Sequence, residues 1–286
     1  MFHLNNIQKE VLDIFSNNKS EIKILLFGPA GLGKTTYANE ISKKSNKNIK
    51  ILQGPLLKRK IDFFNILPLI DKKTIIFIDE IHSISKTVQE LLYSLIDNKK
   101  ITINIGKNFE VDEITFEIEN INIIGATTNL EKLNNSFTSR FTYLIDFSNY
   151  DYDILIKICN DLLSKYRIKL NKKEVNTLIN ISSGNPRTIK NNILKLNDLK
   201  KIENREYFNK LLLINNLNNE GISKRELEYL KILSDSSKSL SYISSLMNLS
   251  TDYIKLKIEP NLIDKELIKI TNKGRSLTKN AKIYFN

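Results

Sequence analysis

The chain has 286 residues, of which 41% are hydrophobic, and a formal net charge of +12 at pH 7. This length allows two or three domains with cores of their own, and no apolar run approaches the roughly 20 residues of a membrane-spanning helix. The single cysteine, Cys159, excludes an internal disulfide, and we expect it to be a buried apolar residue in a cytoplasmic protein. The positive charge favours a polyanionic partner such as nucleic acid. A compositional bias toward lysine, which is abundant throughout the chain, would also produce this charge.

The first half of the chain alternates apolar runs with amphipathic segments. Apolar runs at 22–27, 74–79 and 121–128 predict buried strands, and residues 33–44 and 85–98 predict helices. Alternation of strand and helix predicts an α/β domain, in which a parallel sheet is covered on both faces.

A different pattern separates the second of these helices from the third strand. Hydrophobic and polar residues alternate over 101–105 and again over 114–118, around a polar stretch. Two runs of period two predict a β-hairpin over 101–118, with its turn at Gly106-Lys107-Asn108.

Beyond residue 148 the strand pattern gives way to helical periodicity. The predicted elements are helices at 151–166, 171–182 and 186–201, a linker at 211–223, and helices at 224–234, 239–248 and 250–263. Asn272-Lys273-Gly274 marks the turn of a last short hairpin, which completes the pattern of a winged helix-turn-helix. We therefore expect three domains, at 1–147, 148–218 and 219–286.

Residues 28–35, GPAGLGKT, match the phosphate-binding pattern G-x-x-x-x-G-K-[ST] between a predicted buried strand and a predicted helix. Glycines let backbone N–H groups turn toward phosphates, and the following helix adds its positive end. Lys34 would reach the β- and γ-phosphates, and the Thr35 hydroxyl would ligate Mg²⁺, so the motif predicts binding of ATP with Mg²⁺. The residues expected around the nucleotide are Gly28, Gly31, Leu32, Gly33, Lys34, Thr35 and Thr36.

Two acids, Asp79 and Glu80, end the second predicted strand, where α/β sheets place their ligands. Asp79 is expected to hold Mg²⁺ through water, and Glu80 to polarise the attacking water. Acids at a helix N-terminus would produce the same pattern, but the P-loop in the same chain favours the catalytic interpretation. For His82 the sequence leaves open either a supporting role in this site or a structural one.

Three further polar residues are candidates for contacts with the nucleotide. Thr128 ends the third strand, beside the P-loop strand, where it could sense the γ-phosphate. Arg140, flanked by phenylalanines, either packs its stem on aromatic rings at the surface or reaches the nucleotide of a neighbouring subunit. Arg187 opens the helix at 186–201, where it could touch the nucleotide or pair with an acid.

The sequences of these motifs and their order along the chain, from about residue 7 to 280, resemble those of one protein family. LLFGPAGLGKTTYA, IIFIDEIHSI, INIIGATTN, IEPNLI and TNKGRSLT are similar to signatures of the RuvB family, the bacterial Holliday-junction branch-migration motors among the AAA+ ATPases. The P-loop and the acidic pair indicate only an ATPase of the AAA+ type. The hairpin and the C-terminal segments narrow the resemblance to this family.

The resemblance implies an AAA+ ATPase domain with a parallel sheet, a small helical lid domain and a C-terminal winged-helix domain. It assigns the phosphate and metal roles to Lys34, Thr35 and Asp79, catalysis to Glu80, the two sensor roles to Thr128 and Arg187, and the arginine finger to Arg140. Because an arginine finger acts on the neighbouring subunit's ATP, a homohexameric ring is expected.

The resemblance also implies the partners. Arg275 matches a wing arginine that approaches DNA phosphates, with Lys273 beside it at the wing turn. The hairpin at 101–118 matches the docking site for the junction-binding protein RuvA. The implied function is an ATP-driven motor that moves duplex arms at four-way junctions in recombination and repair.

Three features depart from the family pattern. Residues 1–21 lack the stretches with which the family helps to hold adenine, Thr138 stands in place of a second arginine, and the hairpin turn lacks a glycine-proline continuation. Two other interpretations remain: an AAA+ ATPase of the clamp-loader or replication-initiator type, which should lack the hairpin and wing, and a degenerate DNA-binding scaffold, against which the intact Lys34 and Glu80 argue.

Overall fold

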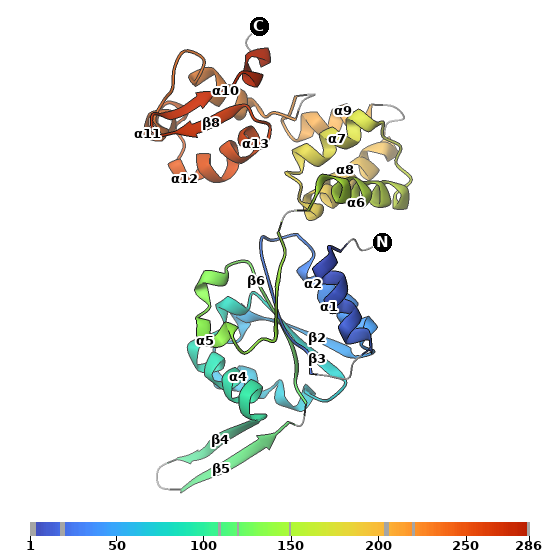
Figure 1. Ribbon diagram of the computed structural model, residues 1–286, viewed down its shortest axis with the longest axis vertical. Coiled ribbons are helices and arrows are strands. Elements are labelled where there is room, and N and C mark those ends of the chain that lie inside the picture. Colours follow the sequence, from blue (N-terminus) through green and yellow to red (C-terminus); the bar gives the residue numbers. More distant parts are fainter. Residues whose placement is uncertain are drawn as a thin grey trace. The chain divides into compact units, whose positions relative to one another are not determined.

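The computed structural model describes residues 4–17, 21–107, 110–118, 120–148, 150–202, 206–218 and 221–284. The chain divides into two compact units, residues 2–149 and residues 150–286 (Figure 1). Among the described residues, no helix combines the length and the apolar character that crossing a membrane requires.

The first unit is built on a parallel five-stranded sheet with the strand order β2–β3–β6–β1–β7. Its strands are β1 (Lys23–Phe27), β2 (Asn48–Gln53), β3 (Thr74–Asp79), β6 (Asn122–Thr127) and β7 (Tyr143–Asp146). The three predicted strands are confirmed as β1, β3 and β6, the inner strands of the sheet. The edge strands β2 and β7 were not predicted, because residues such as Ile51 remain 45% exposed and give no apolar run.

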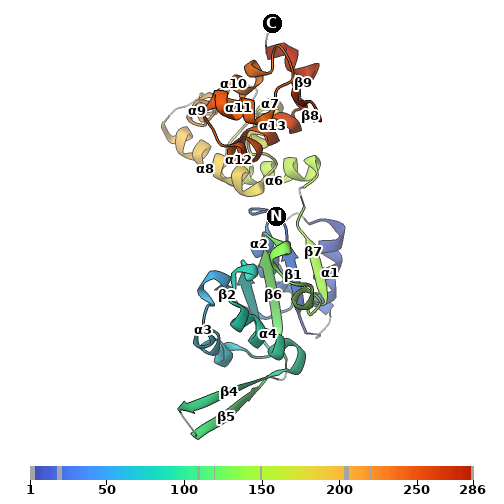
Figure 2. The same ribbon diagram turned by 90° about the vertical axis from the view of Figure 1, so that its left-hand side faces the viewer.

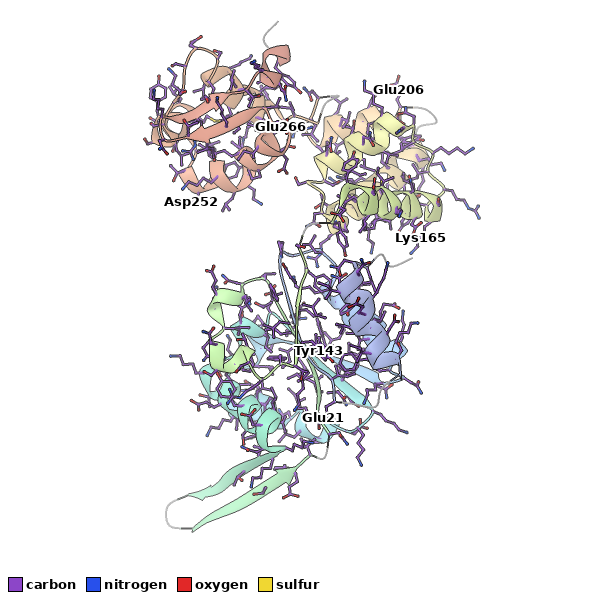
Figure 3. The ribbon with its side chains drawn as sticks, in the orientation of Figure 1. Glu21, Tyr143, Lys165, Glu206, Asp252 and Glu266 are labelled. Carbon is purple, nitrogen blue, oxygen red and sulfur yellow. The ribbon has the colours of Figure 1, made fainter. Side chains whose placement is uncertain are left out.

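Helices cover both faces of this sheet (Figure 2). They are α1 (Asn6–Asn17), α2 (Lys34–Lys44), α3 (Lys60–Phe64), α4 (Lys86–Asn98) and α5 (Asn135–Thr138), with 3-10 turns η1 (Gly54–Leu56), η2 (Leu67–Leu69), η3 (Ile81–Ser83) and η4 (Leu130–Lys132). The predicted helices are confirmed as α2 and α4. Helix α1 was not predicted; it buries Phe15 against the ring of Tyr143, which Figure 3 labels on β7.

The predicted hairpin is confirmed as β4 (Lys100–Lys107) and β5 (Glu110–Glu117), which pair Ile101 with Phe116. It projects from the rest of its unit (Figures 1 and 2). The predicted turn was wrong for Gly106 and Lys107, which belong to β4 and pair with Val111 and Glu110, and Asn108 lies outside the described residues. At the base of the hairpin, Lys99 pairs with Glu21, whose place near the hairpin Figure 3 shows. Although burial disfavours its charged form, hydrogen bonds from Lys99 and Lys23 lower the pKa of Glu21.

The second unit begins with four helices around one core. They are α6 (Tyr152–Lys165), α7 (Lys172–Ile181), α8 (Pro186–Ile202) and α9 (Tyr207–Ile214). The first three confirm the predicted helices, and Cys159 is buried between them. The predicted linker at 211–223 was wrong for its first residues, because Leu211 and Leu212 are buried on α9 and belong to this core.

A separate core holds the winged helix together. Its elements are α10 (Lys224–Ile232), α11 (Leu240–Met247), α12 (Thr251–Tyr253), a π-helical turn (Ile254–Ile258), α13 (Glu259–Asp264), β8 (Ile268–Thr271), β9 (Gly274–Leu277) and the 3-10 turn η6 (Asn280–Tyr284). The predicted last hairpin is confirmed as β8 and β9, the wing. The helix predicted at 250–263 is interrupted by the π turn just before Pro260, whose ring nitrogen has no hydrogen to donate.

Candidate functional site

The P-loop connects β1 to α2 and has the backbone that its glycines allow. Gly28, Gly31 and Gly33 have φ angles of +130°, +87° and +96°, which side-chain-bearing residues rarely adopt. At Gly28 a Cβ would lie 2.3 Å from the carbonyl oxygen of Phe147, so only glycine fits there. The loop therefore turns sharply and delivers the chain to the N-terminus of α2.

Lys34 begins α2 and folds its side chain back over this loop. Its ammonium donates to the carbonyl oxygens of Gly28 at 2.6 Å and Pro29 at 2.9 Å, and the residue is only 7% exposed. A cation, the N-terminus of a helix and a glycine turn together suit an anionic phosphate chain. The neutral carbonyls are partners that phosphate oxygens could replace.

The residues that could hold a divalent cation also suit a bound phosphate chain. Thr35 follows Lys34 on α2, and Asp79 ends β3 at the edge of the sheet where β1 also ends. Within the described part of the chain, no group of three His, Cys, Asp or Glu side chains could hold a metal by itself. Thr35 and Asp79 therefore fit a Mg²⁺ that takes its other ligands from phosphates and water.

Glu80 directly follows β3 in a left-handed backbone conformation, with φ +50° and ψ +48°. Such a conformation costs a side-chain-bearing residue about 1–2 kcal/mol. It places the carboxylate against the end of β6, where Thr128 donates to Oε2 from its hydroxyl at 2.9 Å and from its backbone N–H at 3.3 Å. His82 Nδ1 lies 3.2 Å from the same oxygen. The structure thus brings together Glu80 and Thr128 and adds His82 to them.

Gly54, which directly follows β2, lies close to the backbone of Glu80. A Cβ on Gly54 would lie 2.2 Å from the Glu80 carbonyl oxygen, and that oxygen accepts the N–H of Ser83 at 2.8 Å. Gly54 was not among the predicted site residues. None of the motifs in the sequence contains Gly54, and a glycine after a strand is common in turns.

Arg140 is packed on α4 of its own unit. Its Nε donates to Asp97 at 2.8 Å, its guanidinium lies 4.3 Å from the centre of the Tyr93 ring, and it also donates to the carbonyl of Ser136. The side chain remains 24% exposed. The packing on an aromatic ring agrees with one of the two sequence interpretations, whereas the arginine-finger role stays a prediction.

Arg187 lies in the second unit, on the first turn of α8. Its backbone N–H donates to the side-chain oxygen of Asn185 at 3.0 Å, which caps the helix, and its side chain is exposed. The sensor role of Arg187 stays a prediction.

The two cations predicted at the wing are in different environments. Lys273, in the turn between β8 and β9, is exposed. Arg275 instead points inward, where its Nε donates to Glu259 Oε1 at 2.8 Å and its side chain is only 14% exposed. The Tyr229 hydroxyl donates to the same oxygen of Glu259 at 2.7 Å. This hydrogen bond from Arg275 to Glu259 raises the pKa of Arg275.

The acids that hold the two arginines were not predicted from the sequence. Asp97 and Glu259 pair with Arg140 and Arg275; Asp97 belongs to no recognisable motif, and the family segment IEPNLI, which contains Glu259, does not indicate its partner. For the inward direction of Arg275, the sequence signal is the alternation of side chains between the two faces of β9.

A parallel sheet with the strand order β2–β3–β6–β1–β7, a P-loop after β1 and an acidic pair after β3 define an α/β P-loop ATPase of the AAA+ type, here joined to a winged helix. Residues 6–147 match the Holliday junction DNA helicase RuvB P-loop domain, and residues 219–286 match the RuvB C-terminal winged helix domain. The chain belongs to the RuvB family.

Individual relatives support this membership over most of the chain. The Holliday junction branch migration complex subunit RuvB of Mesomycoplasma hyopneumoniae is 33% identical over 270 residues, which are 91% of this chain and 85% of that protein. The protein of the same name from Mycoplasma genitalium is 31% identical over 274 residues, or 93% and 88%. A solved structure of a RuvB variant from Thermotoga maritima has a TM-score of 0.73 at 25% identity and covers 99% of this chain and 95% of its own.

Proposed function

We propose that this protein is an ATP-driven motor that moves duplex DNA at Holliday junctions, in recombination and repair. The observation that carries the proposal is a P-loop, an acidic pair after β3 and a winged helix in one chain of the RuvB family. The hairpin β4–β5 and the wing β8–β9 are the features that an ATPase of the clamp-loader type was expected to lack.

ATP is held through its phosphates. Lys34 and the N-terminus of α2 neutralise the β- and γ-phosphates, and Thr35 and Asp79 hold the metal ion. Mg²⁺, when bound, stabilises the negative charge that develops on the transferred phosphoryl group. Glu80 orients and polarises the attacking water, and Thr128 links that carboxylate to the end of β6.

Arg140 completes the site of a neighbouring subunit, and Arg187 contacts the nucleotide as a second sensor. A finger that acts on a neighbour requires a closed ring, for which we propose a homohexamer. The partial exposure of the Arg140 side chain, 24%, supports this role, because a finger must present its guanidinium at the surface of its own subunit.

The winged helix contacts the DNA backbone. Lys273 is exposed at the wing turn and supplies a positive charge for a phosphate. A motor that moves along DNA must accept every sequence, so contacts to phosphates suit it better than contacts to bases. The hairpin β4–β5 is the proposed docking site for a RuvA-type protein, and the expected cytoplasmic location stays a prediction.

The test is an ATPase assay with and without a synthetic four-way junction. We expect turnover that the junction stimulates, loss of ATP binding in Lys34→Ala, and retained binding without turnover in Glu80→Gln. Lys44→Ala is the matched control, because Lys44 lies exposed on the same helix. Wild-type turnover in Glu80→Gln would contradict the assignment of the catalytic residue.

A further inference from the structure

His82 lies in a position where its ring can act on Glu80. The turn η3 folds the chain back after Glu80, so that the side chains of residues 80 and 82 both face the end of β6. The ring is 11% exposed, and its Nδ1 lies 2.9 Å from Thr127 Oγ1 and 3.2 Å from Glu80 Oε2. Thr127 itself is fully buried. The ring thus connects a rigid part of the sheet to the carboxylate.

The surrounding hydrogen bonds determine which ring nitrogen carries the hydrogen. Thr127 Oγ1 has one hydrogen, which it donates to the carbonyl of Asn129 at 3.1 Å, and it accepts the N–H of Asn129 at 3.0 Å. The ionised carboxylate of Glu80 can only accept. Both oxygens that face Nδ1 are therefore acceptors, so Nδ1 carries the hydrogen and donates it to Thr127 Oγ1 at 2.9 Å, with Glu80 Oε2 3.2 Å away.

We propose that His82 is a positioning residue for Glu80, an inference that rests on the proposed ATPase function. The two hydrogen bonds from Thr128 end on Oε2 of Glu80, and Nδ1 of His82 lies 3.2 Å from the same oxygen. They fix the carboxylate plane and direct the other oxygen, Oε1, to the attacking water. Thr128 is exposed, whereas Thr127 is buried, so the link through His82 supplies the more rigid of the two supports.

Two substitutions separate the hydrogen bond from the bulk of the ring. His82→Leu removes the donor, and we expect it to lower kcat about 10- to 100-fold, the effect of moving a catalytic group by about 1 Å. ATP affinity should change less than about twofold, because Glu80 contributes to the transition state rather than to binding. His82→Asn keeps an N–H close to the place of Nδ1 and should recover most of the lost turnover.

A double variant tests whether His82 acts through Glu80. In the Glu80→Asp background, which keeps a carboxylate but draws it back from His82, His82→Leu should cause no further loss of the remaining turnover, since two residues that act as a unit are not additive. A full additional loss in the double variant would overturn the positioning role.

The hydrogen position can be measured without nucleotide. The chain has two histidines, His3 and His82, so selective ¹⁵N-histidine labelling gives two spin systems, and His3→Gln assigns them. Long-range ¹H–¹⁵N correlations of the nucleotide-free protein should show His82 as the Nδ1–H tautomer. Thr127→Val should shift the His82 resonances and leave those of His3 unchanged. An Nε2–H tautomer for His82 would contradict the inference.

The outcomes distinguish this inference from the proposed function. If the wild type has no ATPase activity even with a junction, the proposed function fails and the positioning role fails with it. If the wild type turns over, Glu80→Gln is inactive and His82→Leu equals the wild type, only the positioning role is refuted. If His82→Leu lowers the melting temperature as well as turnover, recovery in His82→Asn supports positioning, and no recovery refutes it.

Discussion

The ion pair between Arg275 and Glu259 predicts how a substitution in the wing will act. Arg275→Met keeps most of the side-chain volume and removes the charge that neutralises Glu259, a residue only 3% exposed. Removing one partner of a buried ion pair costs about 3–5 kcal/mol. Because water reaches the guanidinium, which is 14% exposed, we expect about 3 kcal/mol, the lower end of that range.

The double variant Arg275→Met with Glu259→Met should recover part of this loss. It leaves no unpaired charge, and the remaining cost is the hydroxyl of Tyr229, which loses its acceptor Glu259 Oε1. A buried polar group without a partner costs about 1–3 kcal/mol. The double variant should therefore be more stable than the single Arg275→Met variant. Lys273→Met, in the exposed turn of the same hairpin, is the control and should change stability by less than about 0.5 kcal/mol.

Stability and DNA binding are measured separately on the full chain. Hydrogen exchange of the amides of β8 and β9 reports the free energy of opening the wing. A salt titration of binding to duplexes of unrelated sequence reports phosphate contacts, since each contact contributes about 0.9 to the log–log slope. We expect Lys273→Met to flatten the slope by about that amount. Arg275→Met should leave the slope unchanged while it accelerates exchange.

The opposite pattern would refute this reasoning. If Arg275→Met flattened the salt dependence by about one unit and left the exchange of the wing unchanged, its guanidinium would contact DNA rather than hold the wing. If the double variant were less stable than the single variant, the pair would not be coupled as its geometry requires.

Three further predictions concern the two units separately. Arg140→Ala should retain ATP binding and lose turnover, and mixing it with Lys34→Ala subunits should restore part of the activity; no rescue in rings shown to be mixed would argue against a finger that acts on a neighbour. Gly54→Ala places a Cβ 2.2 Å from the Glu80 carbonyl oxygen and should lower kcat more than ATP affinity, as steady-state kinetics would show. Burial raises the pKa of Cys159 to about 11, so iodoacetamide at pH 8 should leave the thiol of the native protein unmodified. Unfolding in urea should expose the thiol, and a higher pH should accelerate its reaction. Rapid labelling of the native protein would disprove the burial.

The inner strands of the sheet were predictable and its edges were not. Strands β1, β3 and β6 are covered on both faces, so their sequences are almost entirely apolar. Strand β2 pairs on one side only and alternates lysine and asparagine with isoleucine, and β7 has four residues. The alternation in β2 breaks at Leu52, and β7 is only four residues long, so neither segment has a hydrophobic pattern long enough to predict a strand.

Helix α9 was missed because its apolar residues precede an asparagine-rich stretch. Leu211, Leu212 and Leu213 read as the start of a linker, although two of the three are buried in the core. Eight residues are too few to establish a period of 3.6, so tertiary packing rather than local preference determines this helix.

The candidate ATPase site was predictable from sequence because its motifs are local. A P-loop needs glycines, a lysine and a threonine within eight positions, and the chain carries that information in one stretch. The contact of His82 with Glu80 spans two positions, but its geometry depends on the left-handed backbone at Glu80, which a sequence of ordinary residues does not reveal. The pair of Arg140 and Asp97 spans 43 positions and involves no motif.

The direction of the Arg275 side chain follows from the alternating pattern of a strand rather than from a motif. In a strand, residues two apart face the same side, and residues paired across a hairpin share a face. Leu277 pairs with the buried Ile268, so Arg275, two positions before Leu277, lies on the same face of the wing, where its own pairing partner Ile270 is 50% exposed and Arg275 itself is turned toward Glu259. An inward arginine requires an acid, and the buried Glu259, which begins α13 directly after the π turn, pairs with it. The period of two therefore predicts a structural role for Arg275, and it leaves Lys273, in the turn where that period ends, as the cation at the wing that is free to approach DNA.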